Sequence, residues 1–269
     1  MQVRSSDLMM QEVAEEMRSY KVVKSNDMIQ KSRFHLSAQE QKIVLYLISR
    51  IKPEDKNFEW QEFNIADFCR VCGIDSTSGK NYKDVREIIR TIGDKSTWIM
   101  CENGIERLFR WITYAEIHHN SGLIKVRMQD DMKPFLLDLH ERFTQYELIY
   151  TIVMKSQYSI RMYELLKSYE YRGRYKVDMD ELKAMLFATK YKRFPDFKRK
   201  VLDVALREIN TLTDLTITYT IIKVGRRYGQ IEFDVSIKKD PTEKMTAWKE
   251  REKALNYKDS DDYTYGHKR

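Results

Sequence analysis

One order of helical and strand patterns occurs twice along this 269-residue chain, and the repeat constrains the fold more than any other feature of the sequence. The order is helix, strand, two helices and two strands, over residues 37–128 and again over 159–237. The residue identities of the two copies hardly match, so the repeat lies in the pattern of apolar and turn residues. We therefore predict an α+β fold class with two tandem domains of one type.

The first copy begins at a helix-capping signal. Ser37 and Glu40 have the spacing of a capping box before an apolar-periodic run, and a second amphipathic helix is predicted over 82–92. After Gly93 the apolar pattern alternates residue by residue, and Asn103-Gly104 is a strong type I′ hairpin signal. Strands are predicted over 96–101, 107–117 and 123–128. Helices packed on a strand hairpin are typical of a winged helix-turn-helix domain.

The second copy contains the same sequence of elements. Helices are predicted over 159–171, 178–187 and 195–210, with a short strand over 174–177. Two further strands, 216–224 and 231–237, flank a turn that begins at Gly225 and ends at Gly229.

The predicted organisation has five parts. They are an N-terminal arm (1–20), winged-helix domain 1 (21–130), a connector (131–155), winged-helix domain 2 (156–240) and a charged C-terminal tail (241–269). The connector is expected to be mostly helical, over 135–139 and 146–154. In the tail, Pro241 is expected to end the preceding strand, and 243–255 to be helical.

The overall charge favours a polyanionic partner. Lys and Arg number 48 against 41 Asp and Glu, which gives a net charge of +7 and a pI near 9.0. Three cysteines are too few for a disulfide framework and suit a reducing compartment, so a cytoplasmic location is expected. No apolar stretch has the length of a signal-peptide core or of a membrane span, so we expect neither export nor membrane insertion.

The densest basic cluster lies at 190–200, where six basic residues accompany one acidic residue, Asp196. Pro195 suits the first turn of a helix, and a helix N-terminus presents free N–H groups to phosphate. The helix divides into an apolar side and a basic side, and its first third would reach base edges in a major groove. The alternative is a solvated face without a ligand. The candidate DNA-binding residues here are Lys192, Arg193, Lys198, Arg199, Lys200 and Arg207.

A basic turn follows between the last two strands. Lys223, Arg226 and Arg227 lie at its tip, and the flanking glycines allow close backbone approach to phosphate or a minor groove. The alternative is a charged edge turn that only prevents aggregation. A basic helix followed by a basic wing is a more specific signal than either feature alone.

The corresponding positions of domain 1 are basic but diluted by Asp84 and Glu87, so we expect weaker or supporting DNA contact there. The strands of this domain carry Trp98, Phe109 and Trp111, which are more often core residues than stacking platforms and could equally serve dimerisation. The candidate DNA-binding residues of domain 1 are Lys80, Asn81, Lys83, Arg86 and Arg90.

Signals for an enzyme or a metal site are poor. Cys69 and Cys72 have the spacing of half a zinc site, but no second pair of ligands follows. His118 and His119 resemble the histidine pair of metal-dependent nicking enzymes, yet neighbours on a strand point to opposite faces. No Walker motif occurs. We therefore expect no catalytic residues, no metal and no cofactor.

Six segments of the second half carry a family resemblance: YSIRMYELLK at 158–167, DELK at 180–183, FKRKVL at 197–202, EIN at 208–210, KVGRR at 223–227 and IEF at 231–233. The first half agrees in Ser25-Asn26 and in LSAQEQK at 36–42. Together they resemble the plasmid replication-initiator family with tandem winged helices, of the theta type. The resemblance covers about 21–237, nearly the whole chain apart from its ends.

Several expectations follow from the resemblance alone. Members of that family bind directly repeated duplex sites (iterons) at a plasmid origin, help to melt adjacent AT-rich DNA and recruit host replication proteins such as a helicase or an initiator. They typically read DNA with the second domain and dimerise through the first, and dimers often repress their own gene while monomers initiate. Carried over, the reading helix is 197–207, with Lys198, Arg199 and Lys200 as the leading contacts, and the wing carries Arg226 and Arg227. The expected setting is the cytoplasm of a bacterium that holds the plasmid.

Two other functions stay open on the sequence. One is a transcriptional repressor with the same fold and no part in replication. The other is a nicking, rolling-circle initiator, which would form a metal-dependent covalent adduct between a tyrosine and DNA.

Overall fold

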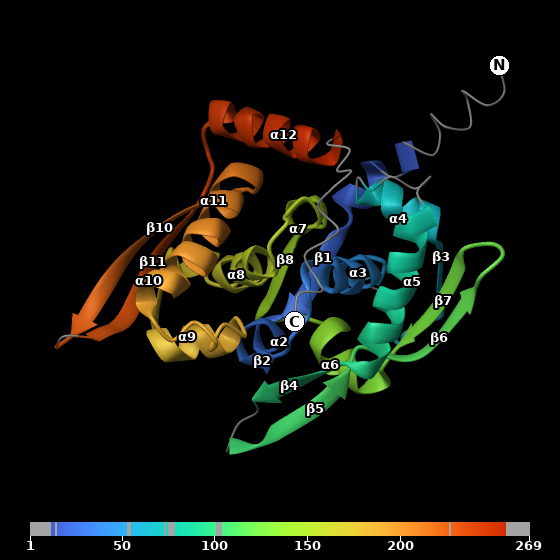
Figure 1. Cartoon of the computed structure of the whole chain (residues 1–269), viewed down its shortest axis with the longest axis horizontal. Helices are drawn as coiled ribbons and strands as arrows, with labels where there is room; N and C mark the ends of the chain where they lie inside the picture. The colour runs from blue at the N-terminus through green and yellow to red at the C-terminus, as the bar shows by residue number, and fades with distance from the viewer. Residues whose placement is uncertain are drawn as a thin grey trace.

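The computed structural model describes residues 12–13, 15–52, 55–72, 74, 79–100, 104–225 and 227–256, with the backbone alone at 81, 82, 224, 227 and 256. The two halves of the chain lie at opposite ends of the longest axis (Figure 1). Each half contains its own helices and its own antiparallel strand pairs.

The first half begins with the elements expected from the capping signal. Ser37 Oγ accepts a hydrogen bond from the Glu40 N–H, and the Glu40 carboxylate accepts one from the Ser37 N–H, so the predicted capping box is confirmed. The helices are α2 (Asn26–Lys31), α3 (Ala38–Ser49), α4 (Ile65–Val71), α5 (Gly79–Asp94) and α6 (Lys133–Leu136). The strands are β1 (Lys21–Ser25), β2 (Ser32–Arg33), β3 (Gln61–Asn64), β4 (Ser96–Met100), β5 (Glu106–Arg110), β6 (Ile112–His118) and β7 (Leu123–Met128).

Strands β2 to β7 form two sheets. Strand β3 pairs with β7, which pairs with β6, while the β4–β5 hairpin forms a separate sheet with β2. The prediction of one strand over 107–117 was wrong because the chain leaves one sheet and enters the other at Trp111. That side chain is only 1% exposed and packs edge-on against Phe34, which fixes the break.

The second half repeats this arrangement with longer wing strands. Its helices are α8 (Gln157–Lys167), α9 (Met179–Met185), α10 (Phe194–Phe197) and α11 (Asp203–Leu212), with a π turn over Lys198–Leu202 between the last two. Its strands are β9 (Arg174–Asp178), β10 (Leu215–Val224) and β11 (Arg227–Ile237). The predicted tail helix is confirmed as α12 (Pro241–Asn256), which lies against α11 (Figure 1).

The two halves share one topology. In the second half β9 pairs with β11, so the strand after the first helix lies beside the last strand, as β3 lies beside β7 in the first half. The β4–β5 hairpin is then an insertion before the wing of the first half, which is β6–β7. This shared order of helix, strand, two helices and two wing strands is the winged-helix arrangement that the pattern predicted.

The segment between the halves contains a strand, so the expectation of a mostly helical stretch was wrong in its middle. Residues Phe143–Glu147 form β8, antiparallel to β1, and the short helix α7 (Ile149–Ile152) follows. Thr144 and Tyr146 are buried while Phe143 and Gln145 are exposed, which is the period of a strand with one buried face. The apolar run that continues from Tyr146 into 149–154 hid this short alternation.

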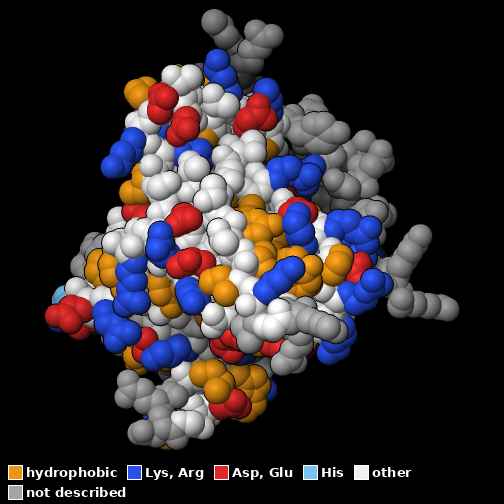
Figure 2. All heavy atoms as spheres, turned by 90° about the vertical axis from the view of Figure 1, so that its left-hand side faces the viewer, with side chains coloured by type: hydrophobic (Ala, Val, Ile, Leu, Met, Phe, Trp, Pro, Cys, Tyr) orange, Lys and Arg blue, Asp and Glu red, His pale blue; other side chains and the backbone are white. Residues whose placement is uncertain are grey.

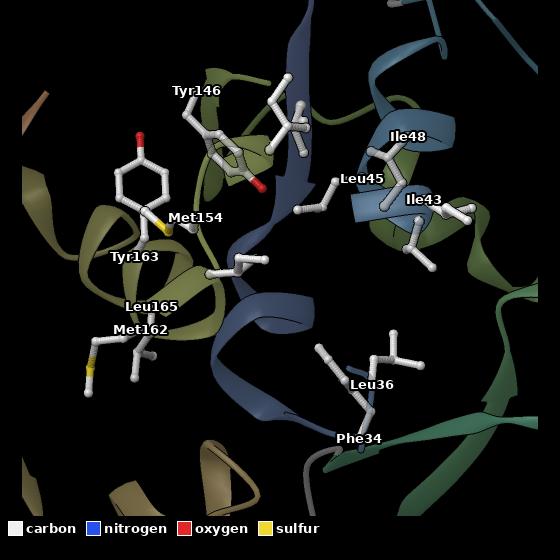
Figure 3. Close-up of a cluster of buried hydrophobic side chains, with 14 of the residues drawn as sticks. Phe34, Leu36, Ile43, Leu45, Ile48, Tyr146, Met154, Met162, Tyr163 and Leu165 are labelled. Carbon is white, nitrogen blue, oxygen red and sulfur yellow. The ribbon is translucent and has the colours of Figure 1, made fainter. Parts of the chain in front are cut away.

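One apolar core is continuous through both halves. Helices α3 and α8 contact each other at the centre, and the buried hydrophobic side chains of the two halves form a single cluster. Figure 3 shows its middle, where Tyr146 of β8 appears between Tyr163 of α8 and Leu45 of α3, and the rings of Tyr146 and Tyr163 are in edge-to-face contact. The halves are therefore joined by packing as well as by the chain.

Buried polar groups also cross between the halves. Lys24 of β1 forms an ion pair of 2.6 Å with Glu164 of α8, and the Tyr146 hydroxyl donates to the same carboxylate oxygen at 2.6 Å. Arg161 of α8 is fully buried and donates to the carbonyls of Ile29 and Ser32 at 2.6 and 3.0 Å. Burial lowers the pKa of Arg161 to about 10, so it keeps its charge at neutral pH. These contacts fix α8 against α2 and β1.

Within the described part of the chain, no helix combines the length and apolarity needed to cross a bilayer.

Candidate nucleic-acid interface

The basic cluster of the second half lies on one continuous helical segment. We call residues 194–212, which comprise α10, the π turn and α11, the basic helix. Its buried side is apolar and faces the core through Phe197, Val201, Leu202, Ala205 and Ile209. The side chains of Arg199, Lys200 and Arg207 are exposed, as the helical spacing predicted, and Lys198 is half exposed.

The π turn keeps the two ends of this helix in phase with the core. The N–H of Asp203 donates to the carbonyl of Lys198, five residues back, so the turn holds one residue more than an α-helical turn. In an unbroken α-helix each residue advances by roughly 100°, and Phe197 and Ile209 would then lie about 120° apart. The wider turn removes most of this difference, and both side chains are fully buried. The basic residues 198–200 therefore lie at the widest part of the helix.

Acidic residues of the same helix hold two of the three leading basic side chains. Lys198 Nζ lies 2.8 Å from an Asp203 carboxylate oxygen, and an Arg199 guanidinium nitrogen lies 3.2 Å from Asp196. The hydrogen bonds to Asp203 raise the pKa of the Lys198 ammonium. Both pairs are at least partly exposed and hence weak in water, so phosphate oxygens can compete for these cations.

The start of the basic helix is open to solvent. Arg193 occupies the N-cap position with an extended backbone, and Pro195 lies in the first turn as predicted. Lys192 and Arg193 are exposed beside it. A helix start with free N–H groups and neighbouring cations is suited to an anion such as a phosphate group.

The wing of the second half is the outer part of the β10–β11 hairpin, residues 222–230. Lys223 is exposed, and Val224 pairs with Arg227 across the turn. Gly225 has a φ of +62°, so the tight turn depends on the conformational freedom of glycine. Arg226 lies outside the described residues, and Arg227 is described by its backbone alone.

The wing and the start of the basic helix lie side by side. The rings of Phe194 and Tyr228 are stacked, with centroids 4.2 Å apart and planes at 25°, and Lys223 Nζ lies 5.6 Å from the centre of the Tyr228 ring. Figure 2 shows this end of the molecule, where Lys and Arg side chains are spread among apolar patches. Among the described side chains, the structure therefore places the wing cation Lys223 near the start of the basic helix.

The basic residues of the first half form a separate group. Lys80, Lys83 and Arg90 are exposed on α5, while Arg90 pairs with Glu87 at 3.1 Å. Arg86 is partly buried, with a guanidinium nitrogen 3.1 Å from His119 Nδ1, and the side chain of Asn81 is not described. Helix α5 and the basic helix lie toward opposite ends of the molecule, with α3 and α8 between them (Figure 1).

The aromatic strand residues of the first half divide between core and surface. Phe109 and Trp111 are buried, and Trp98 on β4 is 45% exposed. The expectation that such residues are mostly core is therefore confirmed for two of the three.

The cysteines and histidines lie in ordinary structural surroundings. Cys69 and Cys72 are both buried at the end of α4, and burial raises the pKa of the Cys72 thiol to about 12. His118 Nε2 lies 3.4 Å from a Glu116 carboxylate oxygen, whereas His119 Nδ1 contacts the Arg86 guanidinium. Among the described residues, no group of His, Cys, Asp and Glu is arranged to hold a metal ion.

The structure also gives roles to residues that the sequence analysis did not count among the candidate site residues. Phe194 and Tyr228 join helix to wing, and Asp196 and Asp203 pair with the leading cations. The aromatic pair had a usable signal, because one ring directly precedes the helix-starting Pro195 and the other lies inside the glycine-bounded turn. The acidic pairs had a weaker signal in their helical spacing from the cations.

Models of known protein families match both halves of the chain. The family model described as "Initiator Replication protein, WH1" matches residues 21–167, and the model described as "Initiator Rep protein, WH2" matches residues 178–235. Two curated proteins of Escherichia coli are similar. A "Replication initiation protein" is 25% identical over 77% of this chain and 66% of its own length, and a "PI protein" is 26% identical over 49% of each chain. The chain thus spans about half to two thirds of these relatives.

A solved structure shares the fold. The Pi initiator protein in complex with iteron DNA superposes with a TM-score of 0.69 at 19% sequence identity, covering 83% of this chain and 99% of that chain. This similarity agrees with the two family models and with the repeated topology of the two halves. The predicted α+β fold with two tandem winged-helix domains is confirmed, and the chain belongs to the family of replication initiator proteins.

Proposed function

We propose that this chain initiates plasmid replication by binding directly repeated duplex sites, the iterons, at an origin. Three findings support the proposal: the two initiator family models, the relative named as a replication initiation protein, and the fold shared with an initiator bound to iteron DNA. The observation that carries it in this chain is the basic helix beside a basic wing at one end of the molecule.

The two features would make different kinds of contact. Lys192, Arg193 and the wing cations would bind phosphate, which supplies affinity without sequence choice. Arg199 and Lys200 project from the exposed side of the basic helix and would reach base edges in the major groove, where one good bidentate contact discriminates by about 1–3 kcal/mol. Helix α5, with Lys80, Asn81, Lys83, Arg86 and Arg90, would add supporting contacts from the first half.

Other parts of the proposal follow from membership of the family. The chain would help to open the DNA beside the repeats and recruit a host helicase or initiator, and it would act in the bacterial cytoplasm. It would dimerise through the first half and repress its own gene in that form. We assign it no catalytic step and no cofactor.

A replication assay tests the proposal against its alternatives. A plasmid that carries the repeats but lacks the initiator gene is expected to replicate only when this chain is supplied in trans. Repression of a reporter without replication would instead identify a transcriptional repressor. A metal-dependent covalent adduct between a tyrosine and a supercoiled origin plasmid would identify a nicking enzyme.

A further inference from the structure

The outer part of the β10–β11 hairpin has little sheet to support it. Strand β9 pairs with β11 only over Gln230–Asp234, so the wing beyond that point consists of two strands alone. The register also shifts between Ile222 and Lys223, at the base of the wing. A two-stranded ribbon is marginally stable by itself, and a register irregularity lets it bend. The direction of the wing must therefore be fixed by another contact.

The stack of Phe194 on Tyr228 is a contact outside the sheet that reaches the wing. Phe194 is the first residue of α10, and Tyr228 is the second residue of β11, so the pair joins the start of the basic helix directly to the wing. Tyr228 is still 42% exposed, so the pair lies at the surface and outside the fully buried cluster around Phe197 and Phe233. The ammonium of Lys223 lies over the same Tyr228 ring from β10.

We propose that Phe194 and Tyr228 form an aromatic clamp that positions the wing relative to the basic helix. The clamp would hold Lys223 at a phosphate backbone while Arg199 and Lys200 occupy the groove. Phe194 and Tyr228 are positioning residues in this proposal, since they act through the cations. The inference rests on the proposed DNA-binding function and names the residues that couple its two parts.

The clamp has a defined consequence for binding. A wing held in the bound direction loses little conformational freedom when it meets DNA, whereas a free wing must be ordered at that moment. An aromatic pair of this kind is expected to change affinity by roughly two- to tenfold. Because the wing contacts phosphate, the loss should be the same on specific and random duplexes.

The test uses the full chain and fluorescence-anisotropy titrations over a range of salt concentrations. Phe194→Ala and Tyr228→Ala are each expected to weaken binding to repeat DNA and to random duplex by roughly two- to tenfold and to reduce the salt slope by about one. Phe194→Tyr and Tyr228→Phe keep both rings and should behave like the wild type. The double alanine variant should be no weaker than either single variant, because the first change already releases the wing.

Several results would overturn the clamp. The first is that the alanine variants show the same salt slope and the same hydroxyl-radical footprint as the wild type. Another is a Tyr228→Phe variant as weak as Tyr228→Ala, which would mean that the hydroxyl group itself contacts DNA. A third is additive losses in the double variant. If the alanine variants do not fold, as judged by circular dichroism, Phe194→Leu is compared with Phe194→Tyr, and equal binding by these two would contradict a role for the ring.

Failure of the clamp is distinguishable from failure of the proposed function. The wild type and Arg199→Ala are measured in the same titrations. If the wild type does not prefer repeat DNA over random duplex, the DNA-reading proposal itself fails. The clamp alone is wrong if three results occur together: the wild type prefers repeat DNA, Arg199→Ala loses this preference, and the clamp variants bind like the wild type.

Discussion

Arg199 and Lys200 are the exposed cations that follow the first turn of the basic helix, and they carry the proposed base contacts. Replacing either by Ala is expected to weaken binding to the repeats by about 10- to 100-fold, with a much smaller loss on random duplex. Lys223→Ala is the matched control, because a wing cation that contacts phosphate should weaken both equally and reduce the salt slope by about one. Equal losses on the two duplexes for Arg199→Ala would contradict the assignment.

In the proposed complex, the carboxylate of Asp203 would compete with DNA phosphate for Lys198. The Asp203→Asn change removes the ion pair of 2.8 Å and one negative charge from the binding face, so affinity for any duplex should rise by roughly two- to tenfold. Filter-binding titrations on repeat and random DNA check this, with Glu243→Gln on α12 as a control for the change in net charge alone. Unchanged affinity in Asp203→Asn would show that Lys198 does not contact DNA.

Cys72 is buried at the end of α4. Burial raises the pKa of its thiol from 9.0 to about 12. Between these two pH values the folded state keeps the thiol proton, whereas the unfolded chain loses it. Stability from this group is therefore present below pH 9.0 and lost as the pH rises toward 12. In a Cys101→Ser background, where Cys69 and Cys72 remain, an aromatic disulfide reagent near pH 9.0 should label the protein only in denaturant. Rapid labelling of the native protein would contradict the burial.

At the scale of elements, the contact between α8 and β1 depends on a buried ion pair. Lys24 and Glu164 have side chains 3% and 1% exposed, and burial lowers the pKa of Lys24. Glu164→Gln keeps an acceptor for the Tyr146 hydroxyl but leaves the ammonium buried without its counter-charge. We expect a loss of about 3–5 kcal/mol in the free energy of unfolding, measured by urea titration.

The double variant Lys24→Met with Glu164→Gln serves as the control for this prediction. It removes both charges from the interface and should recover most of the lost stability. An unfolding free energy for Glu164→Gln equal to that of the wild type would mean that the pair contributes nothing to the join between the halves.

The elements that the sequence predicted well are those with long, regular apolar spacing. Helices α3, α5, α8 and α11 each have regular apolar spacing, and the capping box before α3 marked its first residue. The structure buries every residue of α3 over 40–49 and of α8 over 158–166, so the apolar spacing predicted these two helices but not their complete burial. Strand β8 was missed because its short alternation continues into the apolar run 149–154. The break at Trp111 and the π turn were not predictable from local spacing, since both depend on which core the neighbouring side chains must reach.

At the scale of the whole molecule, the two halves share a topology but differ in the charge of their wings. The wing of the second half carries Lys223 beside a basic helix, whereas the turn of the β6–β7 wing is formed by His119, Asn120, Ser121 and Gly122. This difference agrees with the prediction that the second half is the principal reader of DNA and the first half a supporting one.

The sequence predicted which cations belong to the candidate site, but it did not predict how the side chains of the site contact each other. Basic residues at an exposed helix face are visible in the sequence because charge there is not constrained by packing. The pairing of Lys198 with Asp203 and the stack of Phe194 on Tyr228 are not visible, because they depend on how the wing and helix meet in space.

The most direct measurement is a footprint on the DNA upstream of the chain's own gene and on its origin. The wild type is expected to protect regularly spaced direct repeats, with each protected unit on one face of the duplex. The Arg199→Ala, Lys200→Ala double variant should still retard DNA at low salt but lose that ordered pattern. Irregular protection by the wild type, or an unchanged pattern with the double variant, would contradict the account that the basic helix reads repeated sites.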